Sequence, residues 1–337
     1  MYGTAPFTVA VVHGGPGAPG HIALDIKQDI IEWLLQGDPS IRWQTLRDLT
    51  DANEEAVQTE RQKIATEGWG ARLLALQEDS GMWGGGVYTP KWKSTTYTML
   101  LLRRLGLDPK NAQTQKGCQL LLEKGFYRDG GINYFRSLKH SETCVTGMIL
   151  SILAYFGYQD ERVDILVEHL LAQQMPDGGW NCQSYKGATH SSFHTTIIVL
   201  EGLWEFEKRT DFKLKELTQS QRRGCEFLLA HRLYRSHQTG EIVDPRMTRF
   251  SFPPRWRYDI LRALDYFQAI KLPYNDRMSD ALEIVRKKQQ QDGTWVLQNR
   301  HSGKTFFEME RVGKPSRWNT LRALRVLCWF ERCIMRD

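Results

Sequence analysis

Apolar residues recur at every third or fourth position over most of this chain, which predicts a succession of amphipathic helices. The segments IKQDIIEWLLQ (26–36) and RQKIATEGWGARLLALQ (61–77) show this pattern, and each is long enough for one continuous helix. After residue 20 the chain shows no alternation of strands with helices. The pattern therefore predicts an all-α protein.

The segment TVAVVHGGPGAPG (8–20) differs, because a short apolar run leads through a histidine into a glycine-rich turn. It resembles the oxyanion loop of α/β-hydrolases of the prolyl aminopeptidase branch. Such an enzyme also needs a nucleophile in a G-x-S-x-G elbow, and the sequence contains no such match. We therefore expect residues 1–21 to lie outside a single domain formed by residues 22–337. Deletion of residues 1–20 should leave folding and activity intact.

A repeat organises the remaining chain. Each repeat has a helix, a glycine-aromatic turn and a second helix with an apolar core. Five second helices each carry an anchor leucine, and successive anchors lie 48 to 61 residues apart. An earlier segment, DPSIRWQTLRDL (38–49), is a sixth copy of the second helix. The turns are DSGMWGGG (79–86), RDGGINYF (128–135), PDGGWNC (176–182), QDGTWVL (291–297) and the degenerate TGEIVDP (239–245), and the anchors are Leu102, Leu150, Leu200, Leu261 and Leu321.

One helix pair cannot bury its apolar face alone, so the pairs are expected to stack side by side. Six inner helices can close into a ring, which predicts an (α/α)6 toroid with the turn Trp or Ile filling the gaps between pairs. The N-terminal ends of the inner helices would surround one mouth of the ring, where their partial positive charge favours anions.

These turns resemble the QW repeats of the squalene–hopene cyclase and protein prenyltransferase β-subunit superfamily, over roughly residues 25–335. The acidic D-x-D-D motif of class II cyclases and the D-D-x-x-D motif of class I terpene synthases are both missing from the sequence. Cyclisation of a terpene by either chemistry is therefore not predicted.

A thiol, an imidazole and a carboxylate recur in register on two neighbouring inner helices. Cys144 and His194 each lie six residues before an anchor leucine, and Glu142 lies two residues before Cys144. Three such ligands around one point predict a zinc site with an open fourth position, as in catalytic centres. Cys182 or His190 could supply a fourth ligand, which would make the site structural.

This arrangement resembles the zinc site of protein prenyltransferase β-subunits, in which an Asp-x-Cys pair joins a histidine from the next inner helix. Glu142 stands here for the aspartate. The resemblance implies Zn²⁺ as cofactor and a helical partner subunit, and it gives the isoprenoid diphosphate two basic residues and a nearby tyrosine. The matching positions are Arg136, Lys139 and Tyr97.

Other side chains are candidates for chemistry or for lining the cavity. His140 and Asp259 are possible acid–base groups, although Asp259 could instead pair with Arg255 or Arg257. Aromatic residues could line a cavity for an apolar tail or serve only as core. They are Trp92, Tyr134, Phe193 and Trp256.

Composition and charge narrow the classes of function. The net charge is +6 without a run of five basic residues, which argues against a nucleic-acid partner. The sequence has no run of eighteen apolar residues, so no transmembrane helix is predicted, and it has no positively charged leader, so secretion is not predicted. We therefore expect a cytoplasmic protein whose six cysteines are free thiols.

Three functions remain open after these exclusions. The first is a zinc-dependent enzyme acting on an amphiphilic substrate such as an isoprenyl diphosphate. The second is a zinc-dependent hydrolase of the esterase or lactonase type, in which the metal activates water. The third is a non-catalytic toroid that binds a hydrophobic ligand or a protein. In each case a helical partner subunit or a homo-oligomer is a further expectation.

Overall fold

The computed structural model describes residues 26–209 and 215–334, and within this part the chain is helical, with isolated β-bridges but no strand. The predicted all-α fold is confirmed. The HGGPG segment lies outside the described residues. None of the helices described is long and apolar enough to cross a membrane.

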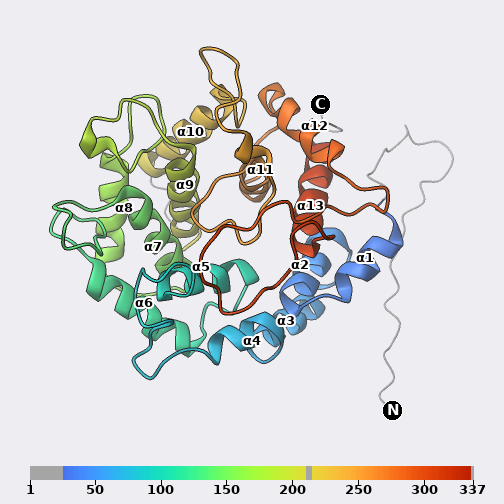
Figure 1. Cartoon of the computed structure of the whole chain (residues 1–337), viewed down its shortest axis with the longest axis horizontal. Coiled ribbons are helices and arrows are strands. Elements are labelled where there is room, and N and C mark those ends of the chain that lie inside the picture. Colours follow the sequence, from blue (N-terminus) through green and yellow to red (C-terminus); the bar gives the residue numbers. More distant parts are fainter. Residues whose placement is uncertain (1–25, 210–214, 335–337) are drawn as a thin grey trace.

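Outer and inner helices alternate along the chain and form two concentric rings (Figure 1). The inner ring closes because α13 packs on both α11 and α2. The inner helices are α2 (Pro39–Leu49), α5 (Thr95–Leu105), α7 (Thr143–Tyr155), α9 (Phe193–Glu207), α11 (Ile260–Ala269) and α13 (Arg317–Ile334). The outer helices are α1 (Gln28–Leu35), α3 (Glu54–Gln62), α4 (Gly68–Leu74), α6 (Ala112–Gly125), α8 (Arg162–Ala172), α10 (Lys215–Ala230) and α12 (Ser279–Lys287).

The repeated tryptophans bridge the outer helix before each turn and the inner helix after it. Each is fully buried, and its backbone N–H donates a hydrogen bond to Oγ1 of a threonine in the following inner helix. Each indole Nε1–H is donated at 2.7 Å to a carbonyl of the preceding outer helix: Trp83 to Leu73, Trp180 to Leu170, and Trp295 to Val285.

The outer helix predicted over residues 61–77 is in fact broken. α3 ends at Gln62, a short 3₁₀ turn follows, and α4 begins at Gly68. The break occurs because Gly68 has a φ of +65°, which favours glycine, and a Cβ there would lie 2.1 Å from Oδ2 of Asp38. The same carboxylate accepts the Trp69 N–H at 2.7 Å. A contact with the start of α2 therefore overrides the helical pattern.

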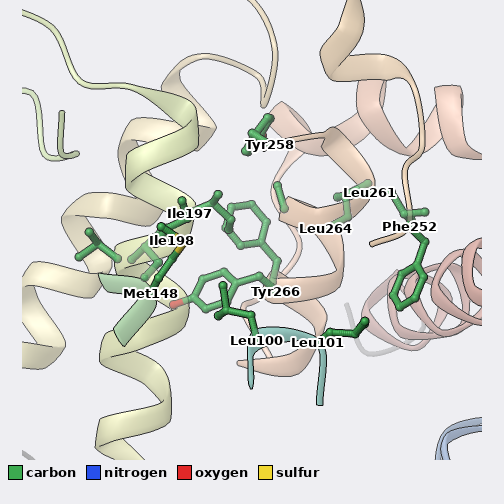
Figure 2. Packing of buried hydrophobic residues seen from close by; sticks show 14 of the residues in the cluster. Leu100, Leu101, Met148, Ile197, Ile198, Phe252, Tyr258, Leu261, Leu264 and Tyr266 are labelled. Carbon is green, nitrogen blue, oxygen red and sulfur yellow. The ribbon is translucent and has the colours of Figure 1, made fainter. Parts of the chain in front are cut away.

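Buried apolar side chains pack together in the interior of the ring (Figure 2). Apolar residues from α5, α7, α9 and α11 meet there, and Phe252, from the segment before α11, stacks on Trp318 with ring centroids 4.2 Å apart. At the C-terminal ends of the inner helices lies a cavity of about 340 Å³, lined by a network of ion pairs centred on Glu201.

Candidate functional site

Two segments cross the mouth of the ring at the N-terminal ends of the inner helices. Residues 250–258 lead into α11, and residues 298–310 belong to the long connection before α13, which crosses the middle of the ring in Figure 1. The second segment is tied to the loop before α5, because the Trp92 backbone N–H donates to Lys304 O and its indole to Ser302 O, both at 2.8 Å. Asn299 Nδ2 donates to Ser251 Oγ at 3.1 Å, which joins the two segments.

Between these segments and the start of α9 lies a pocket of about 240 Å³, here called the basic pocket. It combines four arginines and two histidines with a single carboxylate. Its lining residues are Trp92, His194, Asp244, Arg246, Met247, Arg249, Ser251, Arg257, Tyr258, Asn299, Arg300, His301 and Ser302.

The positive charge of the pocket is only partly compensated. Arg246 pairs with Asp244 at 2.7 Å, and Arg300 pairs with Glu308. Arg249 and Arg257 have no ion-pair partner within the described ranges 26–209 and 215–334. Two uncompensated guanidinium groups on one concave surface favour an anionic ligand.

The two histidines are poised as neutral hydrogen-bond donors. The Tyr258 N–H donates to Nδ1 of His194 at 2.8 Å, so the neutral ring carries its hydrogen on Nε2. Nδ1 of His301 lies 3.3 Å from the Asn299 amide nitrogen, and its buried Nε2 has no partner in the described part of the chain. Burial, together with the nearby Arg257, lowers the pKa of both histidines to about 4. At neutral pH an anion would therefore meet N–H donors as well as guanidinium groups.

The predicted zinc ligands do not converge on one point. Over residues 26–209 and 215–334, no three His, Cys, Asp or Glu side chains are placed to hold a metal ion. Cys144 hydrogen-bonds to Cys182, His194 lines the basic pocket among arginines, and His190 is exposed. Burial raises the pKa of Glu142, which further weakens it as an anionic ligand. These side chains do not fit zinc as arranged, so zinc binding stays a sequence-based prediction.

The residues predicted to hold a diphosphate lie elsewhere on the surface. Arg136 and Lys139 are exposed on the loop before α7, and neither lines the basic pocket. The basic side chains that line a pocket at this mouth come instead from the segments before α11 and α13. The structure thus supplies the basic mouth through different arginines.

Three of the predicted site aromatics are packed into the core. Tyr97 is 1% exposed, and its hydroxyl donates to that of Tyr88 at 3.2 Å. Tyr134 donates to Leu121 O at 2.8 Å, and Phe193 packs against the outer helix α10. The cavity beside Tyr97 has a volume of about 10 Å³, which leaves no room for a substrate there.

The other two predicted aromatics do lie at the basic pocket. Trp92 lines it directly. The Trp256 ring meets His194 edge-on at 5.3 Å, and the Arg257 guanidinium lies 4.4 Å above the same indole. The Trp256 ring therefore packs against both the imidazole and the guanidinium.

The two acid–base candidates have structural partners. Asp259 caps α11 by accepting the Arg262 N–H at 2.8 Å, and its nearest ionic partner is Arg322 at 3.9 Å rather than Arg255 or Arg257. Nδ1 of His140 lies 2.8 Å from the carbonyl oxygen of the next residue, and its ring stacks on Tyr185.

Sequence reasoning missed Arg249, Arg257 and His301. A signal for the arginines was present, because RMTRFSFPPRWRYD (246–259) interleaves basic and aromatic residues immediately before an inner helix. No comparable pattern marks His301, because a long loop brings it to the mouth.

The ring of inner and outer helices defines the protein as an α/α toroid. No protein-family model and no curated protein sequence matches the chain. Among solved structures, a protein from Actinoplanes is 13% identical over 90% of this chain and 87% of its own, with a TM-score of 0.45. The type II terpene cyclase MstE from Scytonema is 12% identical over 83% of this chain and 99% of its own, with a TM-score of 0.34. A variant of that cyclase is described in complex with geranylgeranyl dihydroxybenzoate, its substrate. Likeness at this level does not assign an activity.

Proposed function

We propose that this toroid binds a small molecule through an oxyanion, such as a phosphate, diphosphate or carboxylate group, in the basic pocket. The observation that carries the proposal is the pairing of two uncompensated guanidinium groups, on Arg249 and Arg257, with two neutral imidazoles in one concavity. Guanidinium groups and N–H donors around one anion form charge-assisted hydrogen bonds. The positive ends of the inner helices at this mouth add to the attraction.

The rest of the ligand is expected to be small or to remain outside the ring. The nearest apolar cavity, beneath Trp92 and Phe306, has a volume of about 20 Å³, roughly that of one water molecule. A long isoprenoid tail would enter only if the two crossing segments moved. Prenylated diphosphates therefore test whether the amphiphilic substrate predicted from the sequence can bind.

Calorimetric titration of the full chain with inorganic pyrophosphate tests the site. We expect Arg249→Gln and Arg257→Gln each to weaken binding by about tenfold or more, since a hydrogen bond to a charged group contributes about 1.5–3 kcal/mol. Lys110→Gln, a change of equal charge on an exposed loop away from the pocket, should leave binding intact. Unchanged affinity in the Arg249→Gln/Arg257→Gln double variant, with helicity retained, would refute the proposal.

The same titration with geranyl and geranylgeranyl diphosphate shows whether an apolar tail contributes to binding. Equal affinity for all three ligands would mean that only the head group is bound. A gain of tenfold or more for the prenylated forms would mean that the ring opens to admit an apolar chain, as the prenyltransferase-like reading of the sequence expects.

A further inference from the structure

A serine hydroxyl and an imidazole face each other on the rim between α7 and α8, away from the basic pocket. Oγ of Ser141 lies 2.9 Å from Nε2 of His169, and Nδ1 of the same ring lies 2.9 Å from the backbone oxygen of Asp129. A carbonyl oxygen only accepts, so Nδ1 carries the ring hydrogen. Nε2 is therefore the lone-pair nitrogen, and the Ser141 hydroxyl, which also hydrogen-bonds to the Asp129 carboxylate, lies within hydrogen-bond distance of it.

The backbone around this pair is fixed by the turn before α7. The Asp129 carboxylate accepts the N–H groups of Gly131 and Ser141, at 3.1 and 2.8 Å. A Cβ on Gly131 would lie 2.3 Å from Oγ of Ser141 and 2.8 Å from Nε2 of His169. Only glycine therefore permits the hydroxyl and the ring to meet.

The pair opens onto a cavity large enough for a small acyl group. The cavity has a volume of about 350 Å³ and includes Ser141, His169, Thr143 and Tyr185 in its lining. Ser141 itself is 9% exposed, which is compatible with a nucleophile reached through this cavity.

The next repeat shows that the fold does not require an imidazole at this position. Ser191 occupies the equivalent place before α9, and its N–H donates to Asp177 in the same way. Its hydroxyl donates to the Asp177 carboxylate at 2.5 Å, just as the Ser141 hydroxyl also bonds to Asp129. On the neighbouring outer helix Arg223, which cannot accept a proton, bonds the turn carbonyl of Met175. The Ser–His contact of the second repeat is thus not reproduced in the third repeat, where the outer helix carries an arginine in place of the imidazole.

The N-terminal end of α7, which begins just after Ser141, favours negative charge that develops on a ligand there. Ser141 lies two residues before Thr143, the first residue of this thirteen-residue helix, and the N-cap residue Glu142 makes no side-chain hydrogen bond to the first turn. The partial positive charge at the start of a helix favours an oxyanion that forms beside it.

We propose that Ser141 and His169 form a catalytic dyad that hydrolyses a small carboxylic ester. Oγ of Ser141 attacks the ester carbonyl carbon while its proton moves to Nε2 of His169, and the bond to the alcohol breaks as that alcohol takes the proton. Water then attacks the acyl-serine, gives a proton to Nε2, and releases the acid as Oγ regains that proton. The net change is ester plus water to acid plus alcohol.

A fluorophosphonate probe, which phosphonylates activated serines, tests the dyad on the full chain. We expect one adduct per chain, located on Ser141 by peptide mass spectrometry, and no adduct in Ser141→Ala. His169→Gln should slow labelling by about a hundredfold, because a positioned general base contributes in that range. Ser191→Ala, the matched change in the next repeat, should label like the unmodified chain.

Hydrolysis of p-nitrophenyl acetate provides a second readout, and circular dichroism confirms that each variant is folded. The proposal is overturned if folded protein carries no adduct on Ser141, or if Ser141→Ala hydrolyses the ester at the original rate. Should His169→Gln not fold, His169→Asn and the Ser141→Ala result decide. Neither outcome bears on anion binding in the basic pocket, because the two sites share no residue.

Discussion

The Glu201 carboxylate on α9 accepts two hydrogen bonds from the Arg262 guanidinium on α11, from Nε at 2.7 Å and from Nη2 at 2.8 Å. The same carboxylate also accepts from Arg103 and Arg104 of α5. One buried anion thus joins three inner helices at the C-terminal mouth.

Replacing this carboxylate by an amide should strongly destabilise the fold. Glu201→Gln leaves several buried arginines with too little negative charge, which costs about 3–5 kcal/mol in comparable buried pairs. Urea unfolding followed by circular dichroism measures the loss. Glu168→Gln, on the exposed face of α8, is the control and should change the free energy of unfolding by less than about 0.5 kcal/mol. A similar stability for both variants would show that the network is dispensable.

The same residue predicts acid sensitivity. Although burial alone would raise it, the surrounding arginines hold the pKa of Glu201 well below its usual range. Its stabilising contribution is therefore complete above the unfolded pKa and is lost as the pH falls through the folded pKa. The fall in melting temperature on acidification should be smaller in Glu201→Gln than in the unmodified chain.

Anion binding in the basic pocket should be coupled to protons. The pKa of both His194 and His301 is about 4 in the free protein, and a bound anion favours the charged imidazolium and raises these values. Sulfate, which does not titrate between pH 5 and 7, should therefore bind more tightly at pH 5 than at pH 7. Calorimetry at about pH 5.5 in two buffers of different ionisation enthalpy should show proton uptake. Loss of this uptake in His301→Gln would identify one of the responsible groups, whereas pH-independent affinity would contradict the assignment.

The contact between α7 and α9 should be destabilised by a side chain at Gly202. A Cβ there would lie 2.7 Å from the carbonyl oxygen of Gly147, whereas a Cβ on Gly147 meets its neighbours only at 3.1 Å. We expect Gly202→Ala to cost about 1–3 kcal/mol and Gly147→Ala to cost less. Thermal unfolding of the two variants provides the comparison, and the reverse order would mean that the helices separate easily.

Zinc content can be measured directly. Because Glu142, Cys144 and His194 do not converge, we expect protein purified without chelators to hold zinc well below one ion per chain. Elemental analysis checks this expectation. Stoichiometric zinc that disappears in Cys144→Ala would show instead that binding rearranges these side chains into the site predicted from the sequence.

Much of the fold could be predicted because its determinants are local and repeated. Trp180 has its indole partner ten residues before it and its threonine partner sixteen residues after it, so one repeat contains the whole arrangement. Asp38 starts α2 as its Asp-Pro sequence predicts, with Oδ1 accepting the Ser40 N–H at 2.9 Å. The candidate site was harder to predict. Residues at the same register position of two helices lie at the same depth in the ring, but their side chains need not point toward one another.

The sequence alone determined the ring. Helical periodicity, glycine-aromatic turns and six inner helices leave stacking and closure as the way to bury the apolar faces. Only the tertiary structure decided which side chains meet at the openings of the ring. Arg257 and His301 lie far apart in the chain and meet because two irregular segments cross the ring, and Ser141 meets His169 because α8 packs against the turn before α7. Such contacts depend on loop paths and side-chain directions, which no local pattern encodes.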